Sequence, residues 1–130
     1  MATICKLEIL HQYVFRNSNP AVFGIRIIAG NAKLNIPLID QNGEQVARIK
    51  SLQEEKTPLQ EAKEGQELAM SLPGISFDRR LKEIKYLYAD ISEQQFKSFK
   101  KNKDILSASE LKVLQELHDI KVRKKPDWGI

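Results

Sequence analysis

The chain has 130 residues, of which 42% are hydrophobic and 29% are charged, with 6 glycines and 5 prolines. This composition excludes a disordered or collagen-like chain, and the length suits one globular domain that buries roughly two thirds of its unfolded surface. The net charge is +4, and residues 91–130 hold 9 basic and 6 acidic side chains. Such a mild positive field is compatible with an RNA or ribosomal partner, but it is common in other proteins.

Cysteine content and hydropathy are typical of a protein of the reducing cytoplasm. No apolar run approaches the roughly 20 residues of a membrane-spanning helix, and residues 1–10 lack the features of a signal peptide. Cys5 is the only cysteine and cannot form an internal disulfide, which agrees with a reducing environment. We therefore expect a cytoplasmic chain with no membrane partner.

The first part of the chain carries strand signals. Residues 5–10 alternate apolar and more polar side chains, which is the period of a strand with one buried face. Residues 16–20, rich in Asn, Ser and Pro, interrupt regular structure. Residues 22–29 predict a second apolar strand that Gly30 closes.

A hairpin is predicted at Asn42-Gly43. Both residues tolerate positive φ, so the pair favours a two-residue turn between strands at residues 37–39 and 46–49.

The polar residues 54–64 are predicted to cross the end of a sheet as a loop or a short helical turn. Further strands are expected at residues 68–72 and 86–91. Several short strands at close spacing indicate a small closed barrel.

After Asp90 the pattern becomes helical. Ser92 with Gln95, and Ser107 with Glu110, each have the form of a capping box, in which the first side chain accepts from a first-turn amide and the second reaches back. Apolar side chains then follow at helical spacing: Phe96 and Phe99 in the first helix, and Leu111, Leu114, Leu117 and Ile120 in the second.

Pro126 is expected to end the second helix. The predicted fold class is therefore α+β, with a small antiparallel β-barrel over residues 1–91 and an extension of two or three α-helices over residues 92–130, packed on or beside the barrel.

Patterns for catalysis and for metal or nucleotide binding are missing or weak. No glycine precedes a lysine as in a phosphate-binding loop, and Cys5, His11 and His118 are too far apart in the sequence for a typical zinc site. Cys5 lies on the predicted buried face and is interpreted as packing, and His118 as a boundary histidine with satisfied hydrogen bonds. We expect a binding module without metal or cofactor, not an enzyme.

Two lysine-rich segments, residues 97–103 and 121–125, have two interpretations. They are solvated helix ends that complement the helix dipole, or they contact RNA phosphates. The apolar stripes are typical of core, although a helical pair appended to a complete barrel could keep one strip for another protein.

Three segments resemble one protein family. Residues 13–25, YVFRNSNPAVFGI, closely resemble the opening of the C-terminal domain (domain IV) of translation initiation factor five-B, the archaeal and eukaryotic relative of bacterial initiation factor two. Residues 62–69, AKEGQELA, resemble a later strand entry, and residues 125–130, KPDWGI, resemble the archaeal carboxyl terminus. The resemblance covers nearly the whole chain and implies a barrel like the second domain of elongation factors, followed by helices.

The same resemblance implies a fragment of a larger GTPase. That factor promotes the joining of ribosomal subunits and stabilises methionyl initiator tRNA on the ribosome. Its GTP and magnesium would belong to an upstream domain, so no cofactor is expected in the fragment. The implied partners are initiator tRNA, initiation factor one-A and the ribosome, and a monomer is expected.

In this family the barrel holds the aminoacylated CCA end of initiator tRNA. By similarity to the bacterial relative, the acceptor-end residues would be Gln53, Glu54, Glu55, Lys56, Glu67, Leu68 and Ala69. The bacterial pocket is basic and aromatic, whereas this chain has Gln and two Glu, which suits a free α-amino group better than a formylated one.

A physical hypothesis follows for individual side chains. Glu54 or Glu67 would bind the α-ammonium group of methionine, and Leu68 would contact its thioether. Terminal phosphates could meet Arg16, Arg26, Arg48 or Lys50, although a solvated strand face explains these four side chains equally well.

The added helices resemble a surface that contacts initiation factor one-A. The predicted contacts are Lys112, Leu114, Lys121 and Arg123, and the alternative for Leu114 is packing of the helices onto the barrel. A second hypothesis makes the whole chain a docking module for factor one-A with little RNA affinity. Trp128 is expected to anchor the terminus on the barrel, the alternative being exposure to ribosomal RNA.

Overall fold

The barrel is built from one antiparallel sheet. In the computed structural model, which describes residues 3–130, the strands follow the order β4-β3-β9-β1-β2-β8-β5-β6, with β7 paired to β2. Their bounds are β1 (Cys5–Arg16), β2 (Ala21–Lys33), β3 (Pro37–Asp40), β4 (Gln45–Arg48), β5 (Ser51–Glu54), β6 (Thr57–Leu59), β7 (Glu61–Lys63), β8 (Glu67–Leu72) and β9 (Tyr86–Ala89).

The sheet closes on itself between β4 and β5. Only Ile49 and Lys50 separate these two strands, and their amides donate to the carbonyl groups of Ile36 and Ser71 on opposite sides. One bent segment therefore pairs with β3 at its start and with β8 at its end. The predicted α+β fold with a small antiparallel barrel is confirmed.

Alternate residues of the long strands fill the barrel. Cys5, Leu7 and Ile9 point inward, as predicted, and meet Phe23 and Ile25 of β2 in one buried cluster. Burial raises the pKa of the Cys5 thiol well above its ordinary value. Cys5 is therefore an unreactive core side chain.

The strand β2 does not end at Gly30, contrary to the prediction. Gly30 has a φ of 72°, and a Cβ there would lie 1.9 Å from the carbonyl oxygen of Ile4. Only glycine fits this bend, which lets β2 leave β8 and pair with β7 through residues 31–33.

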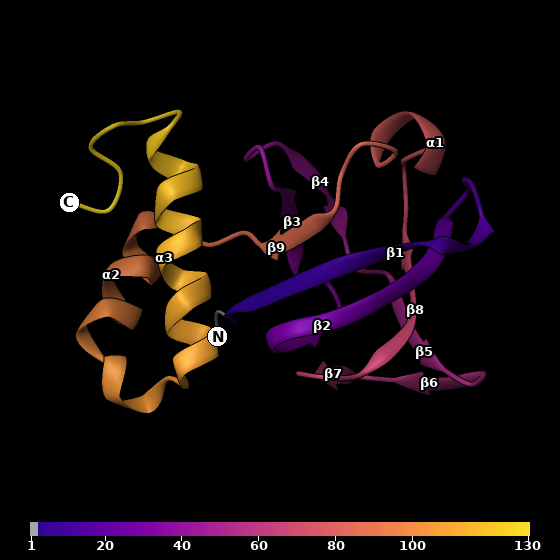
Figure 1. The fold of residues 1–130 in the computed structure, drawn as a ribbon, viewed down its shortest axis with the longest axis horizontal. Coiled ribbons are helices and arrows are strands. Elements are labelled where there is room, and N and C mark those ends of the chain that lie inside the picture. The colour runs from indigo at the N-terminus through magenta and orange to yellow at the C-terminus, as the bar shows by residue number, and fades with distance from the viewer. Residues whose placement is uncertain (1–2) are drawn as a thin grey trace.

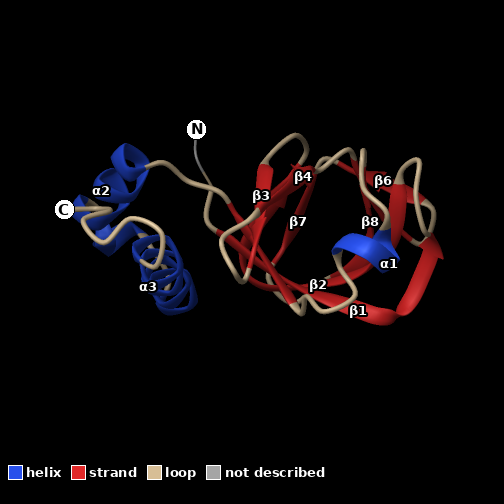
Figure 2. Ribbon diagram, turned by 90° about the horizontal axis from the view of Figure 1, so that it is seen from above, coloured by secondary structure: helices blue, strands red, loops and turns tan. Residues whose placement is uncertain are grey.

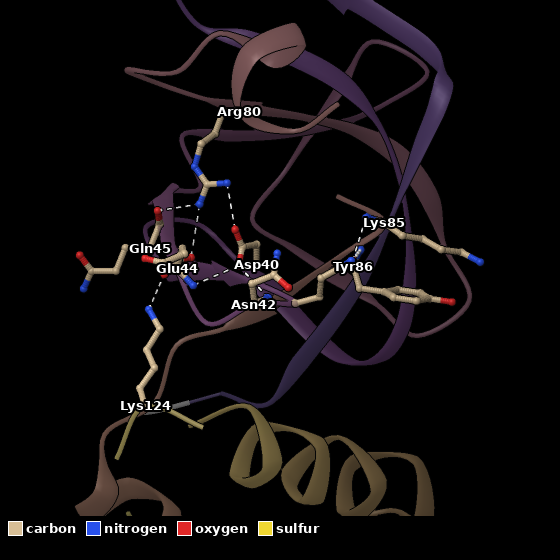
Figure 3. Close-up of polar contacts among 9 residues, drawn as sticks. Asp40, Asn42, Glu44, Gln45, Arg80, Lys85, Tyr86 and Lys124 are labelled. Atoms are coloured by element: carbon tan, nitrogen blue, oxygen red, sulfur yellow. Dashed lines mark hydrogen bonds and ion pairs between the residues drawn. The ribbon is translucent and has the colours of Figure 1, made fainter. Parts of the chain in front are cut away.

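The β3–β4 hairpin has a longer turn than the predicted two residues at Asn42-Gly43. The buried Asp40 carboxylate accepts from the amides of Asn42 and Glu44 at 2.8 and 3.0 Å and pairs with Arg80 at 2.9 Å (Figure 3). The Gly43 amide donates to the Asp40 carbonyl, and Gly43 has a φ of 84°. A three-residue loop with glycine in its last position is the result.

Residues 54–64 contain strands instead of the predicted loop or helical turn. The short β6 and β7 occupy this segment, and within residues 3–130 β6 pairs only with β5. Pro58 lies in this edge strand, where its missing amide hydrogen removes no bond of the sheet. Strands of three residues are too short for an alternating pattern to identify them.

Two predicted helices follow the barrel, and both capping boxes are confirmed. They are α2 (Glu93–Lys101), capped by Ser92 and Gln95, and α3 (Ala108–Val122), capped by Ser107 and Glu110. A short 3-10 turn, η1 (Lys103–Ile105), joins them, and α3 ends before Pro126. The short helix α1 (Phe77–Arg80) was not predicted; its Phe77 ring lies 5.0 Å from that of Phe23, inside the barrel.

The helices pack against one end of the barrel. Figures 1 and 2 show α2 and α3 together at the end where β1 begins, opposite the β1–β2 turn. The apolar stripe of α3 joins barrel residues in a second buried cluster, which contains Ile4, Ala29, Ile39, Tyr88, Leu114, Leu117 and Ile120.

The joint between barrel and helices also contains ion pairs. Glu116 of α3 accepts from Lys6 at 2.8 Å and from the Tyr88 hydroxyl at 2.7 Å. Burial acts to raise the pKa of Glu116, but the bonds from Lys6 and Tyr88 together outweigh it and lower the pKa. A second pair joins Lys121 to Asp90 at 2.5 Å.

The carboxyl terminus folds back onto the helices. Trp128 is buried, as expected, and its aromatic partners are Phe96 of α2 at 4.9 Å and His118 of α3 at 6.2 Å, within the buried cluster that also joins the helices to the barrel. His118 stacks on Phe96, and its Nδ1 atom is buried without a hydrogen bond among the described residues, contrary to the satisfied histidine that was predicted.

Candidate functional site

A cavity of about 520 Å³ lies on the outer face of the barrel. Its floor is a cross-strand row in which Leu10 of β1 faces Gly24 of β2, Gly24 faces Ala69 of β8, and Ala69 faces Gln53 of β5. Small residues in the middle of this row leave a hollow between larger side chains. Figure 1 shows β1 and β2 running away from the helices toward the turn that joins them.

Two exposed aromatic side chains form one wall. Tyr13 and Phe15 line the cavity and are 51% and 65% exposed. An irregularity in β1 places them there: Leu10 pairs with Gly24 and Val14 pairs with the adjacent Phe23, so residues 11–13 have no partners between them. Such a bulge re-aims side chains, and it turns this part of β1 toward the outer face.

Gly24 is needed for the fit of this wall. A Cβ at Gly24 would lie 3.0 Å from Cβ of Tyr13 and 3.5 Å from Cβ of Leu10. The aromatic wall therefore sits directly over a position where any side chain would compete for space.

The opposite rim is the turn between β5 and β6. Glu55 and Lys56 form this turn with φ values of 48° and 69°. Two successive positive φ values are typical of Asn-Gly, and they strain residues with long side chains. Strain of this kind concentrates at functional sites, and both side chains line the cavity.

A carboxylate closes the cavity on the β8 side. Glu67 lines the cavity, and its Oε2 atom accepts from Nε and Nη2 of Arg26 at 2.9 and 2.7 Å. Nη1 of Arg26 donates to Glu8 at 3.0 Å. The guanidinium of Arg26 is thus engaged by two carboxylates.

The structure brings together most of the residues predicted for the acceptor end. Six of the seven pocket positions line the cavity, namely Gln53, Glu55, Lys56, Glu67, Leu68 and Ala69. Glu54 is absent from the lining, and its carboxylate accepts from Gln66 at 3.5 Å.

The four arginine and lysine residues predicted as phosphate contacts do not line the cavity. Arg16 donates to the carbonyl group of Ser18, and Arg48 donates to that of Asn35 near β4. Lys50 is exposed at the bend between β4 and β5. Lys56 is the one cation among the residues that form the cavity.

Sequence reasoning missed most of the apolar lining. Leu10, Tyr13, Phe15, Val22 and Gly24 also surround the cavity. The signal was present in the aromatic pair Tyr13 and Phe15, whose side chains are large, apolar and two positions apart. It could not be used without the bulge, because strict alternation from Ile9 would turn both rings into the barrel.

The residues predicted to contact factor one-A do not form one surface. Leu114 is buried at the base of a groove of about 290 Å³ between α2 and α3, and Lys121 is paired with Asp90. Lys112 and Arg123 are exposed and lie about three helical turns apart on the face that carries Glu116. The groove itself is bordered by Lys100 and Lys103.

Two further findings concern residues 3–130. No group of three or more His, Cys, Asp and Glu side chains in this part of the chain is arranged to hold a metal ion. Within the same residues, every helix is too short or too polar to cross a membrane.

Comparison with known proteins identifies the family. A profile of the family described as elongation factor Tu domain 4 matches residues 4–88. The chain belongs to this family. It is 32% identical to the chain in the crystal structure of GDP-bound aIF5B from Aeropyrum pernix, with a TM-score of 0.88, and the match covers 98% of this chain and 21% of that one.

Curated relatives agree with the structural match. Probable translation initiation factor IF-2 of Methanopyrus kandleri is 36% identical over 96% of this chain and 21% of its own length. The corresponding factor of Pyrococcus furiosus is 40% identical over 90% of this chain and 12% of its own length. The chain is thus a domain of the archaeal IF-2/aIF5B type, and these matches confirm the resemblance seen in the sequence. The chain spans about a fifth or less of the length of these relatives.

Proposed function

We propose that this domain binds the aminoacyl acceptor end of methionyl initiator tRNA in the cavity beside Tyr13 and Phe15. The observation that carries the proposal is the convergence of six predicted acceptor-end positions on one cavity. Its volume of about 520 Å³ lies within the range of roughly 300–1,000 Å³ that small-ligand sites occupy.

The lining suits each part of an aminoacylated nucleotide. Tyr13 and Phe15 offer faces on which an unpaired base stacks, which is the usual way proteins hold single-stranded RNA ends. Lys56 offers a cation for a phosphate. Leu10 provides apolar surface for a thioether, whereas the side chain of Leu68 belongs to the buried cluster inside the barrel.

The carboxylates favour a free amino group. Glu67 and Glu55 line the cavity with Lys56 as the only cation, so the site carries an excess of negative charge. An α-ammonium group forms a charge-assisted hydrogen bond with such a carboxylate, whereas a formylated nitrogen carries no charge. Because Glu54 lies outside the lining, Glu67 is the proposed partner of the amino group.

An NMR titration tests this proposal. The labelled chain is titrated with a methionylated acceptor-end RNA and with the same RNA uncharged. We expect amide shifts at Gln53, Glu55, Lys56, Glu67, Leu68 and Ala69 that are larger with the methionylated RNA. Equal shifts with both RNAs, or shifts confined to α2 and α3, would refute it.

A second proposed activity is docking of initiation factor one-A on the helices. The groove between α2 and α3 favours it, because Phe96, Leu111 and Leu114 line the groove and Lys100 and Lys103 border it. A partner segment with apolar and acidic side chains fits this surface. Binding of purified factor one-A that the Leu111→Asp variant abolishes would support the groove; binding unaffected by this variant would place the contact elsewhere.

The remaining roles depend on the larger factor. We propose that the parent is a ribosome-dependent GTPase that binds GTP and magnesium outside this chain, and that this chain contributes binding only, as a cytoplasmic monomer. A hydrolysis screen of the isolated chain with GTP is expected to stay at the buffer rate, and turnover that tracks the purified protein would refute the binding-only role.

A further inference from the structure

Three charged side chains form a row beside the cavity floor. Glu8 of β1 faces Arg26 of β2, and Arg26 faces Glu67 of β8, so the three lie on the same outer face as Leu10, Gly24 and Ala69 but one cross-strand row further along. The strands β1, β2 and β8 are neighbours in the sheet, and Figure 1 shows β1 beside β2. Negative, positive and negative groups therefore alternate across three neighbouring strands.

The bonds within this row are not symmetrical. Two donors of Arg26, Nε and Nη2, converge on a single atom, Oε2 of Glu67, and Nη1 reaches Oε1 of Glu8. Among residues 3–130, Oε1 of Glu67 makes no hydrogen bond. One oxygen of the cavity carboxylate is fixed by Arg26, and the other stays available.

The charges in the row do not cancel. One guanidinium stands between two carboxylates, which leaves one net negative charge beside the cavity. Arginine suits this position because its planar fork binds two carboxylates at once and stays protonated. A lysine has three donors on one nitrogen atom, but it lacks the planar fork that holds two carboxylates in one fixed geometry.

We propose that Arg26 is a positioning residue that fixes Glu67 for a cationic amine, and that it is not the phosphate contact predicted from the sequence. This inference rests on the proposed function of the cavity. Arg26 binds Oε2 and thereby restricts the carboxylate to an orientation in which Oε1 is free for the α-ammonium group. Glu8 takes up the third donor of the fork and keeps the guanidinium in the plane of the row.

The test compares Arg26→Gln and Arg26→Lys with the unmodified chain. Affinity is measured for the methionylated acceptor-end RNA and for the same RNA uncharged, at several salt concentrations. A positioning role predicts that both variants lose roughly tenfold in affinity for the methionylated RNA, because a charge-assisted bond is weakened, with little change for the uncharged RNA. The slope of log affinity against log salt is expected to stay the same for the uncharged RNA.

A phosphate contact predicts a different pattern. Arg26→Gln would then lower the affinity for both RNAs equally and reduce the slope of log affinity against log salt by roughly 0.7, the value for one phosphate on a single strand. Arg26→Lys would retain binding. Either of these results would overturn the positioning role.

A matched control lies on the same strand. Lys33 of β2 pairs across the sheet with Glu61 of β7 at 3.6 Å, outside the cavity. Lys33→Gln removes a comparable cross-strand ion pair and is expected to change neither affinity. If this variant reproduces the loss seen with Arg26→Gln, the effect belongs to general charge or strand stability, and the positioning role is refuted.

The two proposals fail in distinguishable ways. If the unmodified chain binds both RNAs equally, the amine-reading function fails, and the positioning role fails with it. If the unmodified chain prefers the methionylated RNA and Arg26→Gln keeps that preference, the function stands and only the positioning role is overturned.

Discussion

The joint between barrel and helices and the cavity on the outer face of the barrel differ in how far their side chains are paired and buried. At the helical end, Glu116 is bonded to both Lys6 and Tyr88, and Lys121 to Asp90, all in a partly or fully buried joint. At the cavity, Tyr13 and Phe15 are exposed, and the turn between β5 and β6 holds Glu55 and Lys56 at positive φ.

This difference separates a structural joint from a binding surface. Paired charges and an apolar stripe fix the helices on the barrel, because Glu116 and Lys121 each bond to a partner on the barrel side of the joint. The cavity leaves aromatic surface and carboxylate oxygens open, which costs stability that a ligand can restore. Substitutions at the joint should therefore affect folding, and substitutions at the cavity should affect binding.

The largest effect is expected at the centre of the joint. Leu117 of α3 is fully buried in the cluster that joins helices and barrel. Leu117→Ala should lower the free energy of unfolding by about 2–5 kcal/mol, because it removes apolar burial and leaves a cavity. Urea unfolding measures this loss. Leu111→Ala, at a half-buried position of the same helix, is the control, and an equal loss from both variants would contradict a joint centred on Leu117.

The ion pair of the joint should contribute less. Glu116→Gln leaves Lys6 without its anionic partner and should cost about 1–3 kcal/mol in urea unfolding at neutral pH. Because the folded-state pKa of Glu116 lies below its ordinary value of 4.5, the unmodified chain keeps this contribution above about pH 4.5 and loses it as the pH falls through the lowered pKa. The difference between the two proteins should therefore shrink in acid. A difference that stays constant from pH 7 to pH 3 would contradict this role.

The aromatic wall should affect binding without affecting stability. Phe15→Ala is expected to weaken the binding of acceptor-end RNA by about 1–3 kcal/mol, the usual contribution of one stacked base. Its free energy of unfolding should stay within about 0.5 kcal/mol of that of the unmodified chain. Ile105→Ala is the control, since Ile105 is 69% exposed, close to the 65% of Phe15, and lies in η1 away from the cavity. Unchanged RNA affinity of the Phe15 variant would remove the ring from the site.

The smallest effect is expected at the strained turn between β5 and β6, where the substitution should raise the free energy of unfolding instead of lowering it. Lys56→Gly relieves a φ of 69° and should raise the unfolding free energy by up to about 1 kcal/mol while weakening RNA binding through the lost cation. Lys63→Gly, in β7 and outside the set of positive-φ residues, should instead destabilise the chain. A destabilised Lys56→Gly variant would show that its side chain stabilises the turn more than the backbone strain opposes it.

Local patterns predicted the elements that depend on neighbours in the sequence. The capping boxes at Ser92 and Ser107 and the inward alternation of Cys5, Leu7 and Ile9 were confirmed, because each depends on contacts within a few residues or on one fixed period. The β3–β4 turn was predicted in place but not in length, since the buried Asp40 carboxylate selected the longer loop.

The candidate site was only partly accessible from the sequence. The resemblance of residues 62–69 led to Glu67, Leu68 and Ala69, which line the cavity. The aromatic wall of Tyr13 and Phe15 was not predicted, because a bulge after Leu10 reverses which side chains of β1 face outward. The residues of the bulge carry no local sequence signal for it. The sequence left Arg26 open between a phosphate contact and a solvated strand face, because its partners Glu8 and Glu67 are distant in the chain.

The sequence by itself therefore determined the change from strands to helices after Asp90, the helix caps, the inward face at the start of β1 and the family. Only the tertiary structure decided that the bent β4–β5 segment closes the barrel, that Tyr13 and Phe15 meet Gln53 and Lys56 around one cavity, and that Arg26 is engaged by two carboxylates. The physical reason is range: propensity, capping and periodicity act over a few residues, whereas strand register and charge pairing join residues that are close only after the sheet has formed.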